Sequence, residues 1–251
     1  MIRLVGDVAA SQEGILEKRR ILMDGLVKMV AAHRWWWSVS EKRDPNGRPN
    51  HTAVSHGGFE NGLFAKLLAA IDDSGSWPIF THFSKEMEES GQHLTRTRSQ
   101  MDLDDQFSVP RTNALWAEAG VTDLILSVCP LDKGDFSAVA IYRGHDSARF
   151  TPREAHIVHM VLTGVEWIHA LSLSDDRKAV LSKLSPRRRM VLNLVLEGQS
   201  RKEMAASLKI SVHTLDGYVK DIFKLFDVHS QAELIARFRS GEGAGTPESG
   251  D

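Results

Sequence analysis

The chain has 251 residues, of which 42% are hydrophobic, and its formal net charge is -2. This composition is ordinary for a globular protein of one or two domains. It excludes a membrane protein, because no apolar run approaches the roughly 20 residues needed to cross a bilayer. Cys129 is the only cysteine, so an intrachain disulfide is excluded. The N-terminal segment MIRLVGDVAASQEG is too short and too polar for a secretory signal, and we therefore expect a cytoplasmic protein.

The small net charge hides an asymmetry along the chain. Residues 1–176 contain 18 Lys and Arg against 24 Asp and Glu, whereas residues 177–240 contain 13 against 6. A basic surplus is typical of a segment that binds phosphates, and an acidic remainder repels DNA. We therefore expect any contact with nucleic acid to lie in the C-terminal part.

Hydrophobic periodicity predicts helices and a hairpin in the first part of the chain. The expected elements are a helix over 15–33, a strand over 35–40, a turn over 44–47, a strand over 52–56 and a helix over 59–71. Alternation along the first strand sends Trp35 and Trp37 to one face and Trp36 to the other. These tryptophans either line a ligand pocket or fill the core, and core packing is the more frequent outcome.

The middle of the chain contains a stretch that is harder to interpret. Residues 73–109 are polar and charged, with one or two helical turns as an option over Lys85–Glu89. They are long for a connection, which is typical of a lid or a binding loop. Regular elements then follow: a helix over 110–119, a strand over 121–128, a turn over 132–135, a strand over 136–142 and a helix over 151–171. Thr151, Pro152 and Glu154 have the pattern of a capped helix start.

This order of elements predicts an α+β fold with an antiparallel sheet and packed helices over residues 1–171. It resembles the GAF/PAS-like sensor fold, most closely in RFTPREAHIVHMVLTGVEWIHAL, and the resemblance implies a sensory or dimerisation domain. A response-regulator receiver domain is excluded, because the sequence lacks the alternating βαβ runs, the early acidic pair and the late strand-end lysine. A LuxR-type autoinducer-binding domain has a related plan and is an alternative.

The rest of the chain divides into three segments. We interpret residues 172–183 as a linker, 184–239 as an all-α domain of four short helices, and 240–251 as a disordered tail rich in Gly, Ser and acids.

Residues that are typical of helix starts mark the four helices. Pro186 suits a first helical turn, and Ser200 with Glu203 has the spacing of a capping box. Ser211 is the next N-cap, and Ser230 opens the fourth helix. Two short helices, a brief turn and a longer third helix form the plan of a helix-turn-helix.

Specific residues within this plan match a known family. LSPRRRMVLNLVLEGQS, then KEMA, then L-x-I-S-x-x-T, and a V-x-S-x-A-E-L ending run without a gap from Leu184 to Phe238. They resemble the LuxR/FixJ-type DNA-binding domain. The resemblance implies that the chain binds double-stranded DNA, as a homodimer on paired half-sites.

In a helix-turn-helix, exposed positions near the start of the second motif helix reach base edges. Here these positions are Val212, His213, Asp216, Gly217 and Lys220. The resemblance places Lys202 and Thr214 at phosphates, and Lys224 is a further candidate. Asp216 departs from the family, which often has a basic residue there. We expect Lys220 to hold Asp216 in place, so that Asp216 accepts a hydrogen bond from cytosine N4.

The sequence contains few signals for metal binding or catalysis. His156 and His159 have i, i+3 spacing but no acid or thiol at supporting distance along the chain, so we expect no metal site and no cofactor. Cys129 lies in an apolar strand and is predicted to be a core thiol. The nucleophile motifs, phosphate loops and zinc motifs of enzymes are not found in the sequence.

The sequence therefore predicts a cytoplasmic transcriptional regulator that is not an enzyme. Its N-terminal domain would sense a signal, with a small molecule or a protein as partner, and its C-terminal domain would bind DNA. One alternative is an N-terminal module for dimerisation or protein interaction without a small ligand. The other is an enzyme with a helical tail.

Overall fold

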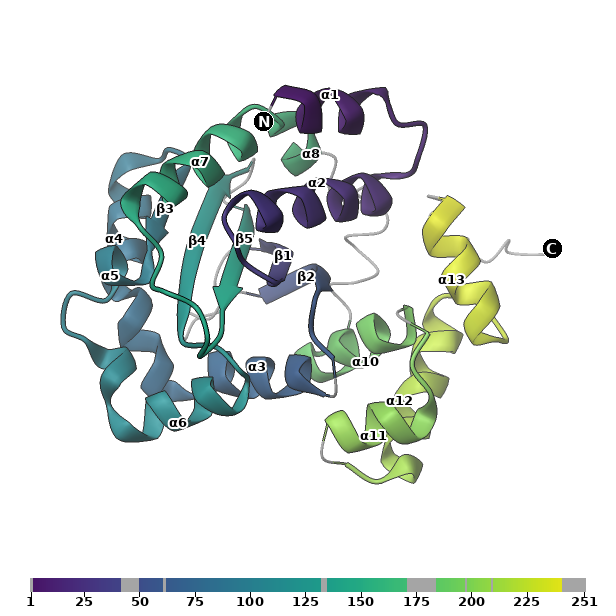
Figure 1. Ribbon diagram of the computed structural model, residues 1–251. Helices are drawn as coiled ribbons and strands as arrows, with labels where there is room; N and C mark the ends of the chain where they lie inside the picture. The colour runs from purple at the N-terminus through teal and green to yellow at the C-terminus, as the bar shows by residue number, and fades with distance from the viewer. Residues whose placement is uncertain are drawn as a thin grey trace.

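A computed structural model of the chain describes residues 2–41, 50–60, 62–131, 135–170, 184–196, 198–208 and 210–240. Figure 1 shows two parts, which we call the sheet module (residues 2–170) and the helical module (residues 184–240). Within the described ranges, no helix is both long enough and apolar enough to cross a membrane.

The sheet module is built on five antiparallel strands in the spatial order β2-β1-β5-β4-β3. Their bounds are Arg34–Glu41 for β1, Asn50–Gly57 for β2, Leu94–Thr97 for β3, Asp123–Pro130 for β4 and Phe136–Arg143 for β5. The hairpin partner predicted for the tryptophan strand is confirmed, because β1 pairs with β2 on one side and with β5 on the other. The fold is therefore α+β with an antiparallel sheet, as the element order predicts.

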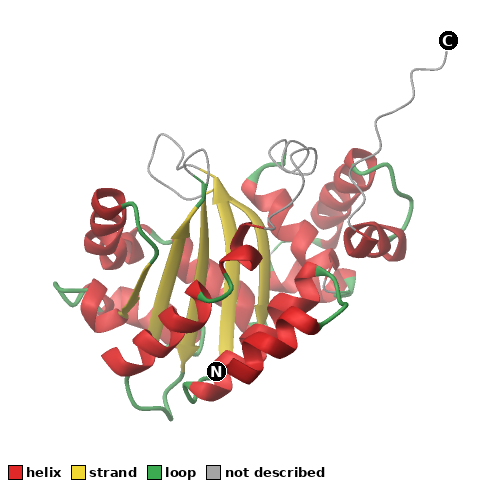
Figure 2. Cartoon of the chain, turned by 90° about the horizontal axis from the view of Figure 1, so that it is seen from above, coloured by secondary structure: helices red, strands yellow, loops and turns green. Residues whose placement is uncertain are grey.

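Helices cover both faces of this sheet (Figure 2). One face carries α1 (Ile2–Ala10), α2 (Ile15–Met29), α7 (Pro152–Thr163) and α8 (Glu166–Ala170). The other face and the β3 edge carry α3 (Leu63–Asp72), α4 (Thr81–Ser90), α5 (Arg98–Met101), α6 (Pro110–Glu118) and the 3-10 turns η1 (Ser74–Phe80) and η2 (Gln106–Ser108). Trp35 and Trp37 pack in the first layer and Trp36 in the second, each at most 4% exposed. The predicted alternation is confirmed, and the three tryptophans are core residues.

The helical option over Lys85–Glu89 is confirmed by α4, but the prediction that 73–109 is otherwise irregular is wrong, because this stretch folds into η1, α4, β3, α5 and η2. Buried ion pairs organise it together with buried apolar side chains such as Ile79, Phe83 and Phe107. The Arg98 side chain is 4% exposed, and its Nε donates to Asp123 Oδ1 at 3.2 Å. The Asp102 carboxylate accepts the backbone N–H groups of Gln106 and Phe107 at 2.7 and 2.9 Å. Such polar structure leaves no periodic hydrophobic signal in the sequence.

Several helix ends differ from the prediction because of the backbone conformation. The helix expected over 15–33 ends at Met29, since Ala31 adopts a positive φ of 46°. The helix expected from 59 begins at Leu63, after Gly62 at φ 75°. The last long helix is divided between α7 and α8 near Gly164, although its predicted Thr151 capping box is confirmed. The first helix, α1, is not predicted from the sequence.

Some predicted features lie outside the described residues. These are the turn over 44–47, positions 132–134 of the second turn, residue 171, the linker over 172–183 and the tail over 241–251. Cys129 is described and is buried, and burial raises the pKa of its thiol to about 11. Its prediction as a core thiol is confirmed.

A cluster of histidines and hydroxyl groups lies between the sheet and the α7–α8 layer. Its contacts are His169 Nδ1 to Ser137 Oγ at 2.9 Å, His93 Nε2 to Ser127 Oγ at 2.9 Å, and His159 Nδ1 to Thr95 Oγ1 at 3.1 Å. Burial, assisted by a neighbouring histidine, lowers the pKa of His169 to about 3 and that of His93 to about 4. Among the described residues, no group of three His, Cys, Asp or Glu side chains is placed to hold a metal ion.

This cluster should make folding stability depend on pH. The unfolded chain protonates its histidines near pH 6.5, whereas buried His169 and His93 stay neutral down to much lower pH. Stability is therefore full above about pH 6.5 and falls as the pH drops towards 4. We expect the free energy of unfolding in urea to be about 2–3 kcal/mol lower at pH 5 than at pH 7. His169→Leu should reduce this difference, and the exposed control His156→Leu should not. An equal pH dependence in all three proteins would contradict the assignment.

Candidate nucleic-acid interface

Capping side chains define where the helices of the helical module begin. The helices are α10 (Pro186–Leu196), α11 (Arg201–Ser207), α12 (Val212–Leu225) and α13 (Gln231–Ser240). At α11, Glu203 N donates to Ser200 Oγ at 3.3 Å, and Ser200 N donates to Glu203 Oε2 at 2.8 Å. That backbone N–H lowers the pKa of Glu203. At α12, Thr214 N donates to Ser211 Oγ at 3.0 Å. Both predicted N-caps are confirmed.

A short turn joins α11 to α12 and holds them at a fixed angle. Ile210 N donates to Ala205 O at 3.0 Å, which closes the turn against the end of α11. Met204 from α11 and Leu215 from α12 are each 0% exposed, and they meet in one hydrophobic core. The two helices with their turn therefore form a helix-turn-helix.

Helix α12 has a buried face and an exposed face. The buried face consists of Leu215, Val219 and Ile222, each at most 3% exposed. The exposed face carries all five positions that were predicted to contact bases: Val212, His213, Asp216, Gly217 and Lys220. A methyl group built on Gly217 would meet no atom within 4 Å, so packing within the chain does not require glycine there. These five residues share the side of α12 that is open to an incoming partner.

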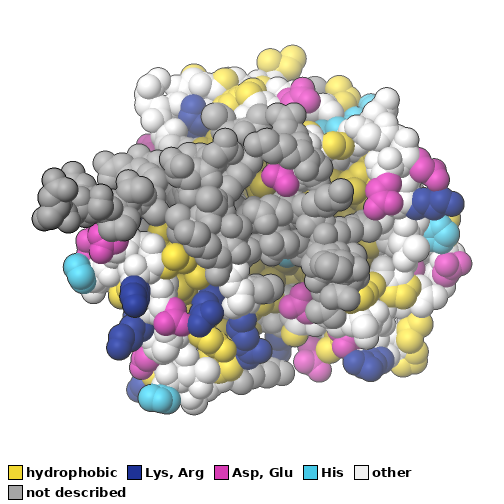
Figure 3. Space-filling view, turned by 180° about the vertical axis from the view of Figure 1, so that it is seen from behind, with side chains coloured by type: hydrophobic (Ala, Val, Ile, Leu, Met, Phe, Trp, Pro, Cys, Tyr) yellow, Lys and Arg dark blue, Asp and Glu magenta, His cyan; other side chains and the backbone are white. Residues whose placement is uncertain are grey.

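The remaining predicted contact residues lie near this face. Lys202 is exposed in the first turn of α11, and Lys224 is exposed in the last turn of α12. Thr214 is exposed, and its hydroxyl lies 2.8 Å from Ser211 Oγ. Figure 3, which views the molecule from behind, shows Lys and Arg side chains gathered over the helical module at lower left. The module thus presents Lys and Arg side chains around α12, while α12 itself carries two exposed lysines, Lys220 and Lys224, and two exposed aspartates, Asp216 and Asp221.

The structure pairs Asp216 with a residue that sequence reasoning did not identify. Arg201 Nε lies 3.4 Å from Asp216 Oδ1, and Arg201 also stacks over the ring of Phe223 at 5.8 Å. The expectation that Lys220 holds Asp216 is therefore wrong. Arg201 follows the N-cap Ser200, so its place in the sequence suggests only a helix start. Its contact with α12 depends on how the two helices cross.

A second cross-helix ion pair joins α10 to α12. Arg188 Nη2 lies 2.5 Å from Asp221 Oδ2, and the Arg188 guanidinium lies 5.9 Å from the centre of the Tyr218 ring. Both pairs are partly exposed, so each adds little stability. Their effect is to orient polar side chains on the surface of α12.

The capped helices, the tight turn and the exposed face of α12 define a helix-turn-helix domain of the DNA-binding class. Residues 182–238 match the model of the family described as bacterial regulatory proteins, luxR family. The C-terminal domain of this chain is a LuxR-family regulatory domain.

Curated relatives match part of the sequence. The chain is similar to the transcriptional regulatory protein DesR of Bacillus subtilis (strain 168), with 31% identity over 83 residues, 33% of this chain and 41% of DesR. It is also similar to the probable transcriptional regulator ycf29 of Cyanophora paradoxa, with 41% identity over 51 residues, 20% of this chain and 24% of the relative. The matches thus span less than half the length of these two relatives.

Among solved structures, the chain is similar to SdiA of Escherichia coli. The superposition covers 96% of both chains, with 15% sequence identity and a TM-score of 0.42.

Proposed function

We propose that the protein is a transcriptional regulator whose helical module binds specific double-stranded DNA and whose sheet module responds to a signal. The observation that carries the proposal is a helix-turn-helix that leaves the N-terminal half of α12 exposed, within a segment that matches the LuxR-family model. The proposal places the protein in the cytoplasm and assigns it no catalytic activity. Residues 172–183 are proposed to link the two modules. The protein is proposed to bind DNA as a homodimer.

The proposed contacts follow from the geometry of α12. A helix-turn-helix inserts the N-terminal half of this helix into the major groove. The residues proposed to reach base edges are Val212, His213, Asp216, Gly217 and Lys220. Lys202, Thr214 and Lys224 are proposed to contact the phosphate backbone, since they lie at the margins of the exposed face.

Asp216 is the proposed specificity determinant. A carboxylate in the groove accepts a hydrogen bond from cytosine N4 and disfavours bases that present acceptors. Its ion pair with Arg201 at 3.4 Å restricts its orientation, so that it is presented in a narrow range of positions. Arg201 also compensates part of the repulsion between Asp216 and the phosphates.

We expect Asp216→Ala to relax sequence preference at one position while total affinity holds or rises, because a repulsive charge is removed. Lys220→Ala should instead weaken binding by about 1–3 kcal/mol if Lys220 makes a base contact. The measurement is a binding-site selection with each protein at one fixed salt concentration. Asp221→Ala is the matched control, since Asp221 is an exposed, ion-paired acid on another side of α12. Asp216 does not read bases if its variant selects the wild-type motif with the same information content.

One observation favours the alternative in which the sheet module contains no internal ligand. The space between the sheet and α3, η1, α4 and α6 is occupied by large side chains that are each at most 4% exposed. These are Trp36, Phe64, Ile79, Phe83 and Trp116. An interior filled by side chains agrees with a module that contains no internal ligand. In that case the signal would be received at the surface of the sheet module.

A further inference from the structure

The two modules meet along one side of the sheet module. Helix α11 contacts α3, and helix α10 contacts β2 (Figure 1). One continuous cluster of buried side chains runs through both modules, with Phe64 on one side and Leu194 on the other. The helical module is therefore docked on α3 through apolar contacts, while the exposed face of α12 stays free of the sheet module.

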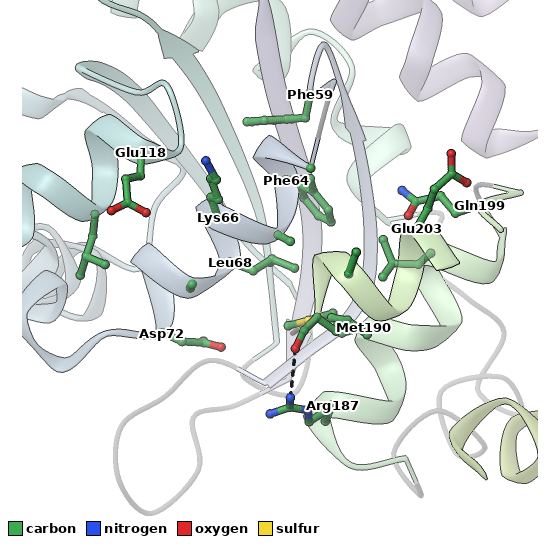
Figure 4. Close-up of a pocket in the computed structure, with 17 residues that line it drawn as sticks. Phe59, Phe64, Lys66, Leu68, Asp72, Glu118, Arg187, Met190, Gln199 and Glu203 are labelled. Carbon is green, nitrogen blue, oxygen red and sulfur yellow. Dashed lines mark hydrogen bonds between the residues drawn. The ribbon is translucent and has the colours of Figure 1, made fainter. Parts of the chain in front are cut away.

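The docking leaves a cleft between α3 and the pair α10–α11 (Figure 4). Its volume is about 840 Å³, within the range of 300–1,000 Å³ that is usual for small-molecule sites. Apolar side chains from both modules line it: Phe59, Phe64, Leu68 and Leu115 from the sheet module, and Met190, Leu194 and Leu208 from the helical module. Phe59, Leu68, Leu115 and Met190 are half-buried, so an apolar occupant would bury surface that is now exposed to water.

The charged residues of the cleft are unevenly distributed. Arg187 is the cation on the helical-module wall, and among the described residues its guanidinium has one acceptor, the Leu208 carbonyl at 3.2 Å. Glu203 on the same wall is engaged by Ser200 in the capping box. A guanidinium without a carboxylate partner, next to an apolar surface, suits an anionic group on a ligand.

The opposite wall limits the charge of that group. Asp72 and Glu118 line the sheet-module side together with Lys66. These two acids repel any anion, and they repel a doubly charged head such as a phosphate monoester about twice as strongly as a singly charged carboxylate.

We propose that the cleft binds a small amphipathic carboxylate. Its apolar chain lies on Phe59, Leu68 and Met190, and its carboxylate accepts hydrogen bonds from Arg187. Because the two walls belong to different modules, the occupant fixes the position of α10 and α11 relative to α3. Given the proposed function, the occupant thereby changes the affinity of the protein for DNA by altering the presentation of α12.

Direct binding tests the site without reference to DNA. Isothermal titration of the full chain with decanoate should give saturable binding, which should be weaker with the neutral probe decanol and with the cationic probe decyltrimethylammonium. Arg187→Gln should weaken decanoate binding at least about tenfold and leave decanol binding unchanged. Lys28→Gln, at an exposed cation on α2 far from the cleft, is the matched control.

Filling the cleft tests its location. Ala69 on α3 and Ala206 on α11 are exposed alanines that line opposite walls. Ala69→Trp and Ala206→Trp should each abolish decanoate binding, whereas Ala9→Trp, at an exposed alanine in α1, should leave it intact. Circular dichroism and urea unfolding identify any variant that fails to fold. If one of the two tryptophan variants does not fold, decanoate binding by the other one tests the location of the site. Undiminished decanoate binding in a folded, filled variant would overturn the proposal, as would no saturable binding by the wild type.

The coupling to DNA separates this inference from the proposed function. Fluorescence anisotropy with the DNA recovered by binding-site selection should show an affinity change on adding decanoate in the wild type and none in Ala69→Trp. If the wild type binds no DNA but the pattern of decanoate binding holds, the cleft site stands and the proposed function fails. If DNA binding is normal and decanoate changes it equally in both proteins, the cleft is not the controlling site.

Discussion

Leu234→Asp should unfold the helical module in the fragment of residues 177–251. Leu234 lies in α13 with 0% of its surface exposed, in the core shared with α10 and α12. The substitution removes a buried aliphatic side chain and puts a carboxylate in its place, which we expect to cost about 4 kcal/mol or more. Because the module is small, this exceeds most of the stability it can have. Urea unfolding followed by circular dichroism on residues 177–251 measures the loss.

Ala236→Asp is the matched control, since Ala236 is exposed on the same helix. It should change stability by no more than about 0.5 kcal/mol. Sedimentation of both variants gives a second result, because the resemblance to the LuxR/FixJ type associates the last helix with pairing. A Leu234→Asp fragment with wild-type unfolding and wild-type association would show that α13 contributes to neither.

Affinity for DNA should reside entirely in the helical module and should depend strongly on salt. Residues 177–240 carry 13 Lys and Arg against 6 Asp and Glu, and residues 1–176 carry 18 against 24. If the module neutralises about four phosphates, its affinity should fall roughly a hundredfold between 50 and 200 mM salt. We expect residues 177–251 to bind duplex DNA in an anisotropy titration with this dependence, and residues 1–171 not to bind.

The control is a Lys202→Ala, Lys224→Ala double variant of the C-terminal fragment. Removing two proposed phosphate contacts should lower the slope of log affinity against log salt by about 2. Equal retention of the two wild-type fragments on DNA at low salt would contradict the assignment of affinity to one module. An unchanged slope in the double variant would remove Lys202 and Lys224 from the proposed contacts.

Local sequence patterns predicted the structure correctly where the interacting groups lie close together along the chain. The capping boxes at Thr151 and Ser200 and the N-cap at Ser211 involve side chains and backbone groups three residues apart, and all three are confirmed. The alternation of Trp35, Trp36 and Trp37 follows from the pleat of one strand. In each case the interacting atoms are close along the chain, so the residue types alone predict the result.

Longer-range contacts were not predictable in this way. The order of residues 73–109 depends on Arg98 pairing with Asp123 across 25 positions, and no periodic signal marks it. Asp216 pairs with Arg201 rather than with Lys220, because the crossing of α11 and α12 brings the N-terminus of one helix beside the exposed face of the other. Sequence reasoning identified the face that carries the candidate contacts but chose the wrong partner for its acid.

The sequence by itself determined the α+β plan, the helix-turn-helix and the basic surplus of the C-terminal part, because periodicity, capping and charge are properties of neighbouring residues. Only the tertiary structure decided how the modules meet, since that contact joins α3 to helices more than a hundred residues later in the chain. The cleft beside Arg187 exists only in that arrangement. Its walls come from two separately patterned segments, and neither segment contains a local signal for the other.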